Sequence, residues 1–207
     1  MVLKAILTCD IVNSTKISAA KEKKLKAVLS EVLADCKVEF YRGDSFQVLV
    51  DTPEDALQLA LLCRVAAINL YKDNKIQIAD VRISIGVGTV KTPIKTLSTA
   101  KGEAFILSGR MFDTIAKTNQ RIAISTNNEM ANEGLQVISD FLNFIFEKIT
   151  GKQAEVLFEL LNNQTQIAIA QKTGKTKSTI HQLTTAVHWV QIEKILQYYS
   201  NIIKLIM

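Results

Sequence analysis

The segment YRGDSFQVLV, residues 41–50, predicts a β-hairpin with a carboxylate at its tip. A Gly-Asp pair separates two runs, residues 38–41 and 45–50, that contain the β-branched and aromatic side chains favoured in strands. Gly43 supplies the backbone freedom that a tight turn requires. We therefore expect Asp44 to be held at a defined position at the end of the hairpin.

A second aspartate has a position that allows it to join Asp44. Asp10 ends an apolar run, residues 3–9, which predicts a buried strand. If that strand neighbours the hairpin in one sheet, both carboxylates face a single hard cation such as Mg²⁺. The alternative is that the two aspartates are turn residues without a metal, because aspartate commonly bonds its own backbone in turns.

The first two thirds of the chain alternate between strand and helix patterns. A polar turn at residues 10–15 precedes a helix that ends near residue 36, and further helices are expected at about residues 53–71 and 102–118. Strands at residues 81–90 and 121–126 complete the sheet. The order β-α-β-β-α-β-α-β predicts an α+β domain with a ferredoxin-like core over residues 1–128. Right-handed crossovers then bring the end of the first strand beside the hairpin turn.

Length and composition indicate a folded protein. A chain of 207 residues with 48% hydrophobic content can form one domain and a smaller second unit. No apolar run approaches the roughly 18 residues of a membrane span, and Lys4 and Asp10 interrupt the first apolar segment, so we expect no signal peptide and a cytoplasmic location. The three cysteines are widely spaced and odd in number, which predicts reduced thiols: Cys9, Cys36 and Cys63.

The C-terminal part contains only helical patterns. A connecting helix at residues 129–149 precedes helices at about 151–161, 164–172 and 176–190. Ala170 and Gly174 have the spacing of a helix-turn-helix, which predicts an all-α domain over residues 150–207 that binds double-stranded DNA. Six polar residues are candidates for contacts with base edges and phosphates: Lys175, Lys177, Ser178, Thr179, His181 and Gln182. A helical pair that only packs or dimerises is the alternative.

The last helix, at about residues 190–205, carries two apolar stripes. One stripe has the spacing of a helix packed on its own domain, and the second consists of Trp189, Tyr198 and Leu205. A second subunit that covers this second stripe would make the protein a homodimer, which suits the two-fold symmetry of DNA half-sites. A wholly internal helix is the alternative.

Several motifs in order resemble the class III nucleotidyl cyclase fold and, together with the C-terminal helices, the SatD family of bacterial proteins. They are DIVNST at 10–15, GDSF at 43–46, VRISIGVGTV at 81–90 and GEAFILSGR at 102–110. The resemblance implies that Asp10 and Asp44 hold Mg²⁺ or Mn²⁺ and that Arg110 neutralises phosphate charge. It also implies that backbone N–H groups cradle a nucleotide triphosphate, at Ile11, Asn13, Ser14 and Thr15.

The sequence departs from the cyclase pattern where the nucleotide would be recognised. Ile106 replaces the expected ribose-orienting asparagine, and Phe40 replaces the expected base-reading lysine. Because loss of one such group removes several kcal/mol of transition-state stabilisation, we expect a catalytically degenerate sensory or dimerisation domain in a transcriptional regulator. Two other hypotheses stay open. The first is a metal-dependent nucleotide-binding protein or an active cyclase acting on ATP or GTP, and the second is a protein-interaction scaffold.

Overall fold

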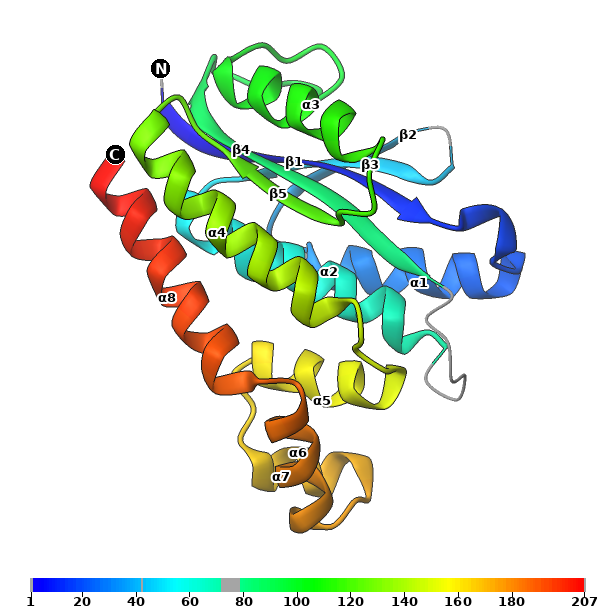
Figure 1. The fold of residues 1–207 in the computed structure, drawn as a ribbon. Helices are drawn as coiled ribbons and strands as arrows, with labels where there is room; N and C mark the ends of the chain where they lie inside the picture. The colour runs from blue at the N-terminus through cyan, green and yellow to red at the C-terminus, as the bar shows by residue number, and fades with distance from the viewer. Residues whose placement is uncertain (1, 42, 72–78, 207) are drawn as a thin grey trace.

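The computed structural model describes residues 2–41, 43–71 and 79–206, and these residues form a mixed α+β fold around a five-stranded sheet (Figure 1). Its strands are β1 (Val2–Val12), β2 (Lys37–Tyr41), β3 (Ser45–Val50), β4 (Asp80–Val90) and β5 (Ile122–Ser125). Their order across the sheet is β2-β3-β1-β4-β5. Neighbouring strands are antiparallel except β4 and β5, which are parallel. The predicted hairpin is therefore present as β2 and β3.

Strand β1 occupies the centre of the sheet and pairs on both sides. Its register with β4 begins with Val2 opposite Val90 and ends with Val12 opposite Asp80. The strand continues past Asp10, so the polar turn predicted to start there begins only at Asn13. The physical reason is that Ile11 and Val12 still pair with β4, which keeps their backbone extended.

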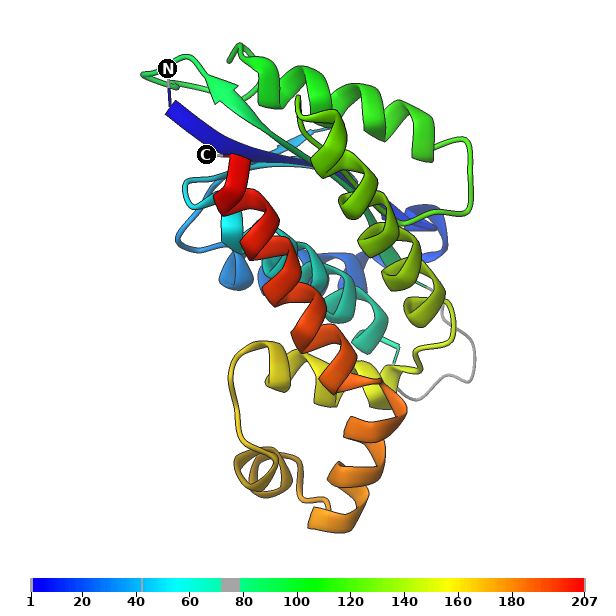
Figure 2. The ribbon, with the colours of Figure 1, turned by 60° about the vertical axis from the view of Figure 1, so that its left-hand side comes forward.

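Helices cover both faces of the sheet. Helices α1 (Ala19–Val32) and α2 (Ala56–Asn69) lie on one face, and α3 (Glu103–Ile115) lies on the other (Figures 1 and 2). Helix α2 is apolar around nearly its whole circumference because it packs between the sheet, α1 and the C-terminal helix α5. Short 3₁₀ turns precede two of these helices, at Ser14–Lys16 and Pro53–Asp55, so α1 and α2 begin a few residues later than the sequence predicts.

The C-terminal part consists of helices, as the sequence predicts. They are α4 (Glu129–Phe146), α5 (Gly151–Leu161), α6 (Gln166–Thr173), α7 (Lys177–Ala186) and α8 (Trp189–Ile206). Helix α5 starts with a capping box in which Thr150 and Gln153 bond each other's backbone N–H groups. Helices α6 and α7 form the end of the molecule farthest from α3 (Figure 1).

Helix α8 packs against the N-terminal part of the chain as well as against its neighbouring C-terminal helices. It runs back beside α4 and reaches the Pro53–Asp55 turn (Figure 2). Its buried side chains Ile192, Ile195 and Tyr199 join the core beneath the sheet, and the Tyr199 hydroxyl donates a hydrogen bond of 2.8 Å to the carbonyl of Pro53. Of the second predicted stripe, Tyr198 and Leu205 are exposed. The structure thus attaches the last helix to the N-terminal part of the chain.

Two further features of the structure are the absence of a membrane-crossing helix among the described residues and the state of the three cysteines. Among them, no helix combines the length and apolar composition that a membrane crossing requires. The three cysteines are free thiols, and burial raises the pKa of Cys9 and Cys63 well above the ordinary thiol value. Such thiols stay protonated and act as small core residues.

Gly86 permits the close approach of α3 to β4. A Cβ atom at this position would lie 2.3 Å from the carbonyl oxygen of Ala104 and 2.4 Å from the backbone nitrogen of Ser108. Because both neighbours are backbone atoms of a helix, neither can move aside without shifting α3.

We expect Gly86→Ala to lower the free energy of unfolding by about 1–3 kcal/mol or more, because the added methyl group overpacks this contact. Urea denaturation measures the change. Gly109→Ala is the matched control, since a Cβ at Gly109 meets no atom within 4 Å and should stabilise α3 by up to about 1 kcal/mol. Equal stability of the two variants would contradict this account of the α3–β4 contact.

Candidate functional site

The structure brings Asp10 and Asp44 to the same end of the sheet. Asp10 lies opposite Ser45 in the β1–β3 register, so Asp44 is the next residue along the neighbouring chain segment. The backbone N–H of Ile11 donates a hydrogen bond of 3.0 Å to the carbonyl of Asp44, which ties the hairpin turn to β1. The proximity predicted from the strand pattern is therefore present.

Each of the two carboxylates already has partners. The Ser14 hydroxyl donates to Asp44 Oδ2 at 2.8 Å, and the Ser45 hydroxyl donates to Asp44 Oδ1 at 3.4 Å. Arg82, which lies opposite Asp10 on β4, places Nη1 3.0 Å from Asp10 Oδ2. The other oxygen, Asp10 Oδ1, is buried and has no hydrogen-bond partner among the described residues. Asp10 thus retains one unused acceptor.

The surroundings of Asp10 shift its proton equilibrium. Burial raises the pKa of this carboxyl above the ordinary aspartate value, the positive charge of Arg82 opposes the rise, and the negative charge of Asp44 adds to it. The folded protein therefore holds a proton on Asp10 more tightly than the unfolded chain does. This contribution to stability is present at low pH and is lost as the pH rises through the raised pKa.

The donor set fits one cation better than two. In the part of the chain that the structure describes, no three His, Cys, Asp or Glu side chains gather as a metal-ligand group. The unused Asp10 Oδ1 is a suitable oxygen ligand, whereas Arg82 already supplies positive charge to Oδ2. A two-metal arrangement would have to displace this guanidinium.

The residues predicted to cradle a nucleotide occupy different environments. Ile11 is buried in β1, and its N–H is used by the Asp44 carbonyl. Asn13 adopts the left-handed conformation at φ 58°, which asparagine tolerates, and Ser14 binds Asp44 through its side chain. Thr15 is exposed in the short 3₁₀ turn. The side chain of Ser14 therefore contacts an aspartate of the pair directly.

In α3, two residues that the cyclase resemblance singles out, Ile106 and Arg110, face away from the sheet. Ser108 is buried and accepts a hydrogen bond of 3.0 Å from Thr8 of β1, so this face of α3 is turned to the sheet. Ile106 and Arg110 flank it at two residues' distance and are exposed, which places them on the opposite face. Phe40 is also exposed at its edge strand and contacts the Phe46 ring. Within one chain, Arg110 does not join the aspartate pair.

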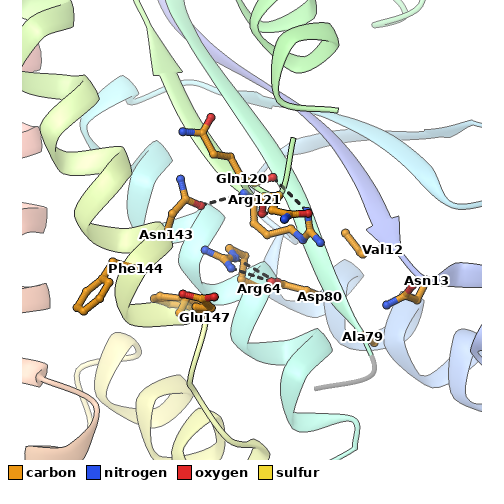
Figure 3. Close-up of a pocket in the computed structure, with 12 residues that line it drawn as sticks. Val12, Asn13, Arg64, Ala79, Asp80, Gln120, Arg121, Asn143, Phe144 and Glu147 are labelled. Carbon is orange, nitrogen blue, oxygen red and sulfur yellow. Dashed lines mark hydrogen bonds and ion pairs between the residues drawn. The ribbon is translucent and has the colours of Figure 1, made fainter. Parts of the chain in front are cut away.

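A cavity of about 540 Å³ lies near this end of the sheet, and sequence reasoning did not predict it (Figure 3). Val12 and Asn13 line it together with a buried ion pair, in which Arg64 Nη2 lies 2.7 Å and Nε 3.1 Å from the carboxylate oxygens of Asp80. Arg121, from the loop before β5, also lines the cavity. A sequence signal did exist, since Arg64 is the only charged residue in the apolar helix α2. A charge in such a helix indicates a buried partner.

The six candidates for DNA contact lie in and just before α7. Lys177, Ser178, His181 and Gln182 are exposed, whereas Ile180 and Thr184 turn towards the protein. Thr179 is half-buried, and its hydroxyl lies 2.9 Å from the hydroxyl of the capping residue Thr176. Lys175 forms an ion pair of 2.7 Å with Glu155 of α5. Four of the six residues thus form one solvent-facing surface, which we call the α7 face.

Comparison with known proteins identifies distant structural neighbours. No protein-family model matches the chain, and no functionally curated protein matches its sequence. Two solved structures of bacterial light-regulated adenylyl cyclases resemble it with TM-scores of 0.43 and 0.42 and identities of 13% and 15%. Each alignment covers 60% of this chain, and the other chains are covered to 76% and 43%. The likeness is partial, and no function is transferred on it.

Proposed function

We propose that this protein binds double-stranded DNA through α6 and α7, which act as a helix-turn-helix. The observation that carries the proposal is the α7 face. Lys177, Ser178, His181, Gln182 and the adjacent Thr185 are exposed on one side of the helix, and the opposite side supplies the buried residues. An exposed helix with basic and polar side chains along one face suits the major groove, where such groups bond base edges and phosphates.

The connection between α6 and α7 supports the same proposal. Gly174 ends α6 in the left-handed conformation at φ 67°, and a Cβ there would meet no other atom. Thr176 then caps α7 by accepting a hydrogen bond from the N–H of Thr179. Ile169 and Ile180 meet in a small core with Val156 of α5, so the three helices hold one another in place. This arrangement presents the start of α7 to solvent.

The lysines around the turn have two roles in this proposal. Lys172 and Lys175 form ion pairs with Glu159 and Glu155, which attach the turn to α5. Lys177 is exposed and forms no ion pair with any described residue, so its charge is available to a phosphate. We therefore assign phosphate contact primarily to Lys177 and an orienting role to Lys175.

We further propose that residues 1–128 form a cyclase-like sensory or dimerisation domain without cyclase activity. The strand order β2-β3-β1-β4 with antiparallel neighbours supports a ferredoxin-like core. The loss of activity follows from Ile106 and Phe40, which offer no hydrogen bond to a ribose or a base. Homodimerisation is proposed through exposed apolar side chains on α4 and α8, such as Val137 and Tyr198.

For the DNA proposal, the double variant Lys177→Ala with Gln182→Ala should bind a duplex about tenfold more weakly, or weaker still, because a phosphate contact and a base-edge contact are lost. Fluorescence anisotropy against salt measures both affinity and its salt dependence. The slope of log affinity against log salt should fall by about one unit, since one fewer phosphate is neutralised.

The matched control is Lys194→Ala with Gln197→Ala, which removes the same residue types from exposed positions of α8. This control should leave DNA affinity unchanged. If both double variants weakened binding equally, the effect would come from net charge alone and the α7 face would not be the binding surface.

A second candidate function is divalent-cation binding at Asp10 and Asp44, with a nucleotide as a further ligand. The orphaned, buried Asp10 Oδ1 favours it, because an unpartnered carboxylate oxygen is costly unless a donor or cation approaches. A bound Mg²⁺ or Mn²⁺ would supply positive charge for phosphate oxygens, and Asp10 and Asp44 would hold it.

If this second proposal holds, Mn²⁺ at ten times its dissociation constant should stabilise the fold by about 1.4 kcal/mol and raise the melting temperature by roughly 3–6 °C. Asp44→Asn should abolish the rise, and the exposed Asp113→Asn should retain it. Because the pKa of Asp10 is raised, protons should displace the cation as the pH falls, at a higher pH than for an ordinary aspartate. A rise that is identical in Asp44→Asn would contradict the site.

A further inference from the structure

The cavity described above contains an arginine whose hydrogen-bonding capacity is not fully used. Arg64 is 1% exposed, and it bonds Asp80 through Nε and Nη2. Its remaining amino group, Nη1, is buried and has no partner among the described residues. A buried N–H group of a charged side chain that lacks a hydrogen bond is destabilising, so an acceptor at this position would be favoured.

A second guanidinium, that of Arg121, lines the same cavity. Arg121 is half-buried, and its Nη1 donates to the carbonyl oxygens of Asn119 and Gln120 at 3.1 and 3.3 Å. No carboxylate of the described chain lies within ion-pair distance of it. Burial lowers the pKa of Arg121, and the charges of Arg82 and Arg64 also lower it, against the opposing effect of Asp80. Arg64 and Arg121 converge on the cavity in Figure 3.

The described residues around the cavity leave an excess of positive charge in its interior. Asp80 pairs with Arg64 and Asp10 pairs with Arg82, so Arg121 is the guanidinium of this cluster without an anionic partner among the described residues. Glu147 also lines the cavity, but it is exposed at the rim, where solvent screens its charge. One bound anion would balance the interior.

The rest of the cavity wall is partly apolar and partly polar, the polar part coming from Asn13, Asn119, Gln120 and Asn143. Val12 and Ala79 lie on one side and Phe144 of α4 lies on the other (Figure 3). Phe146 of α4 also lines the cavity. The central carbon of the Arg64 guanidinium lies 4.3 Å from the centroid of the Phe146 ring, which is a cation–π contact. A volume of about 540 Å³ is within the range of small-molecule sites. The guanidinium groups of Arg64 and Arg121 therefore line a space that is large enough for the apolar part of a small ligand as well.

We propose that this cavity binds a small aromatic oxyanion, with the carboxylate or phosphate group on Arg121 and Arg64 and the flat apolar body between Val12 and Phe144. Guanidinium groups bind planar oxyanions through paired N–H donors, which matches the two arginines. The exposed ring of Phe144 favours an aromatic ligand over a bare inorganic ion. The site is independent of both the α7 face and the Asp44 carboxylate.

Binding of four probes to the full chain tests the proposal: benzoate, phenyl phosphate, inorganic phosphate and neutral benzyl alcohol, each followed by calorimetry and by amide NMR shifts. We expect benzoate or phenyl phosphate to bind at least tenfold more tightly than inorganic phosphate and benzyl alcohol, because the latter two each lack one half of the ligand. The comparison of benzoate with phenyl phosphate shows which oxyanion the site prefers. The largest shifts should occur at residues 119–121 and 143–147.

Arg121→Gln should weaken binding of the tighter probe by at least about tenfold, since a charge-assisted contact is lost. Arg110→Gln removes an exposed arginine from α3 and should leave binding unchanged. If Arg121→Gln does not fold, Phe144→Ser at an exposed position of the wall replaces it and should also weaken binding. The proposal is overturned if no aromatic probe binds at about 10 mM, if inorganic phosphate binds as tightly, or if Arg121→Gln binds like the wild type.

Discussion

The pairing of β1 with β4 along all eleven residues of β1 is the constraint on which the rest of the structure depends. Because β1 also pairs with β3, it fixes the hairpin turn on one side and the start of β4 on the other. Asp10 is consequently held between Asp44 and Arg82, and the buried Asp80 is held in the wall of the cavity. Both candidate ligand sites are therefore products of one strand register, and a slip of one residue would turn these side chains to the opposite face.

The N-terminal part and the C-terminal helices share one hydrophobic core. Helix α5 packs on α2, and α8 reaches back to the carbonyl of Pro53 through the Tyr199 hydroxyl. Helix α2 also carries Arg64, and α4 carries the aromatic wall of the cavity. A ligand in the cavity would thus contact the two helices against which α5 and α8 pack. The proposed helix-turn-helix rests on elements that line a potential ligand site.

The local features of the fold were predictable because they depend on short-range patterns. The strand patterns predicted the hairpin around Gly43 and the proximity of Asp10 to Asp44. The spacing of apolar residues predicted the helices. The packing partners of α8 were not predictable, since a helical stripe indicates that a face is buried but not which element covers it. The sequence therefore predicted that α8 packs on its own domain but did not predict its contacts with α4 and the Pro53–Asp55 turn. The pairing of Arg64 with Asp80 was missed because its partners are separated in sequence and meet only after α2 packs on β4.

The candidate sites were predictable to different degrees for the same physical reason. The α7 face follows from spacing within one helix, so the positions of Lys177 and Gln182 could be inferred from sequence. The cavity is formed by α2, α4, the start of β4 and the loop before β5, and only the tertiary fold brings these segments together. Asp10 illustrates the intermediate case. Its neighbour Asp44 was expected, whereas the ion pair with Arg82 depends on the β1–β4 register.

Amide NMR shifts of the full chain during titration with duplex DNA at low salt test the central claim most directly. Sequence-independent binding to phosphates suffices for this measurement, so the target sequence need not be known. We predict that the largest shifts occur in residues 174–185 and decrease as salt is added. Shifts confined to α8 or to the sheet, or the absence of any shift at low salt, would contradict DNA binding through the α7 face.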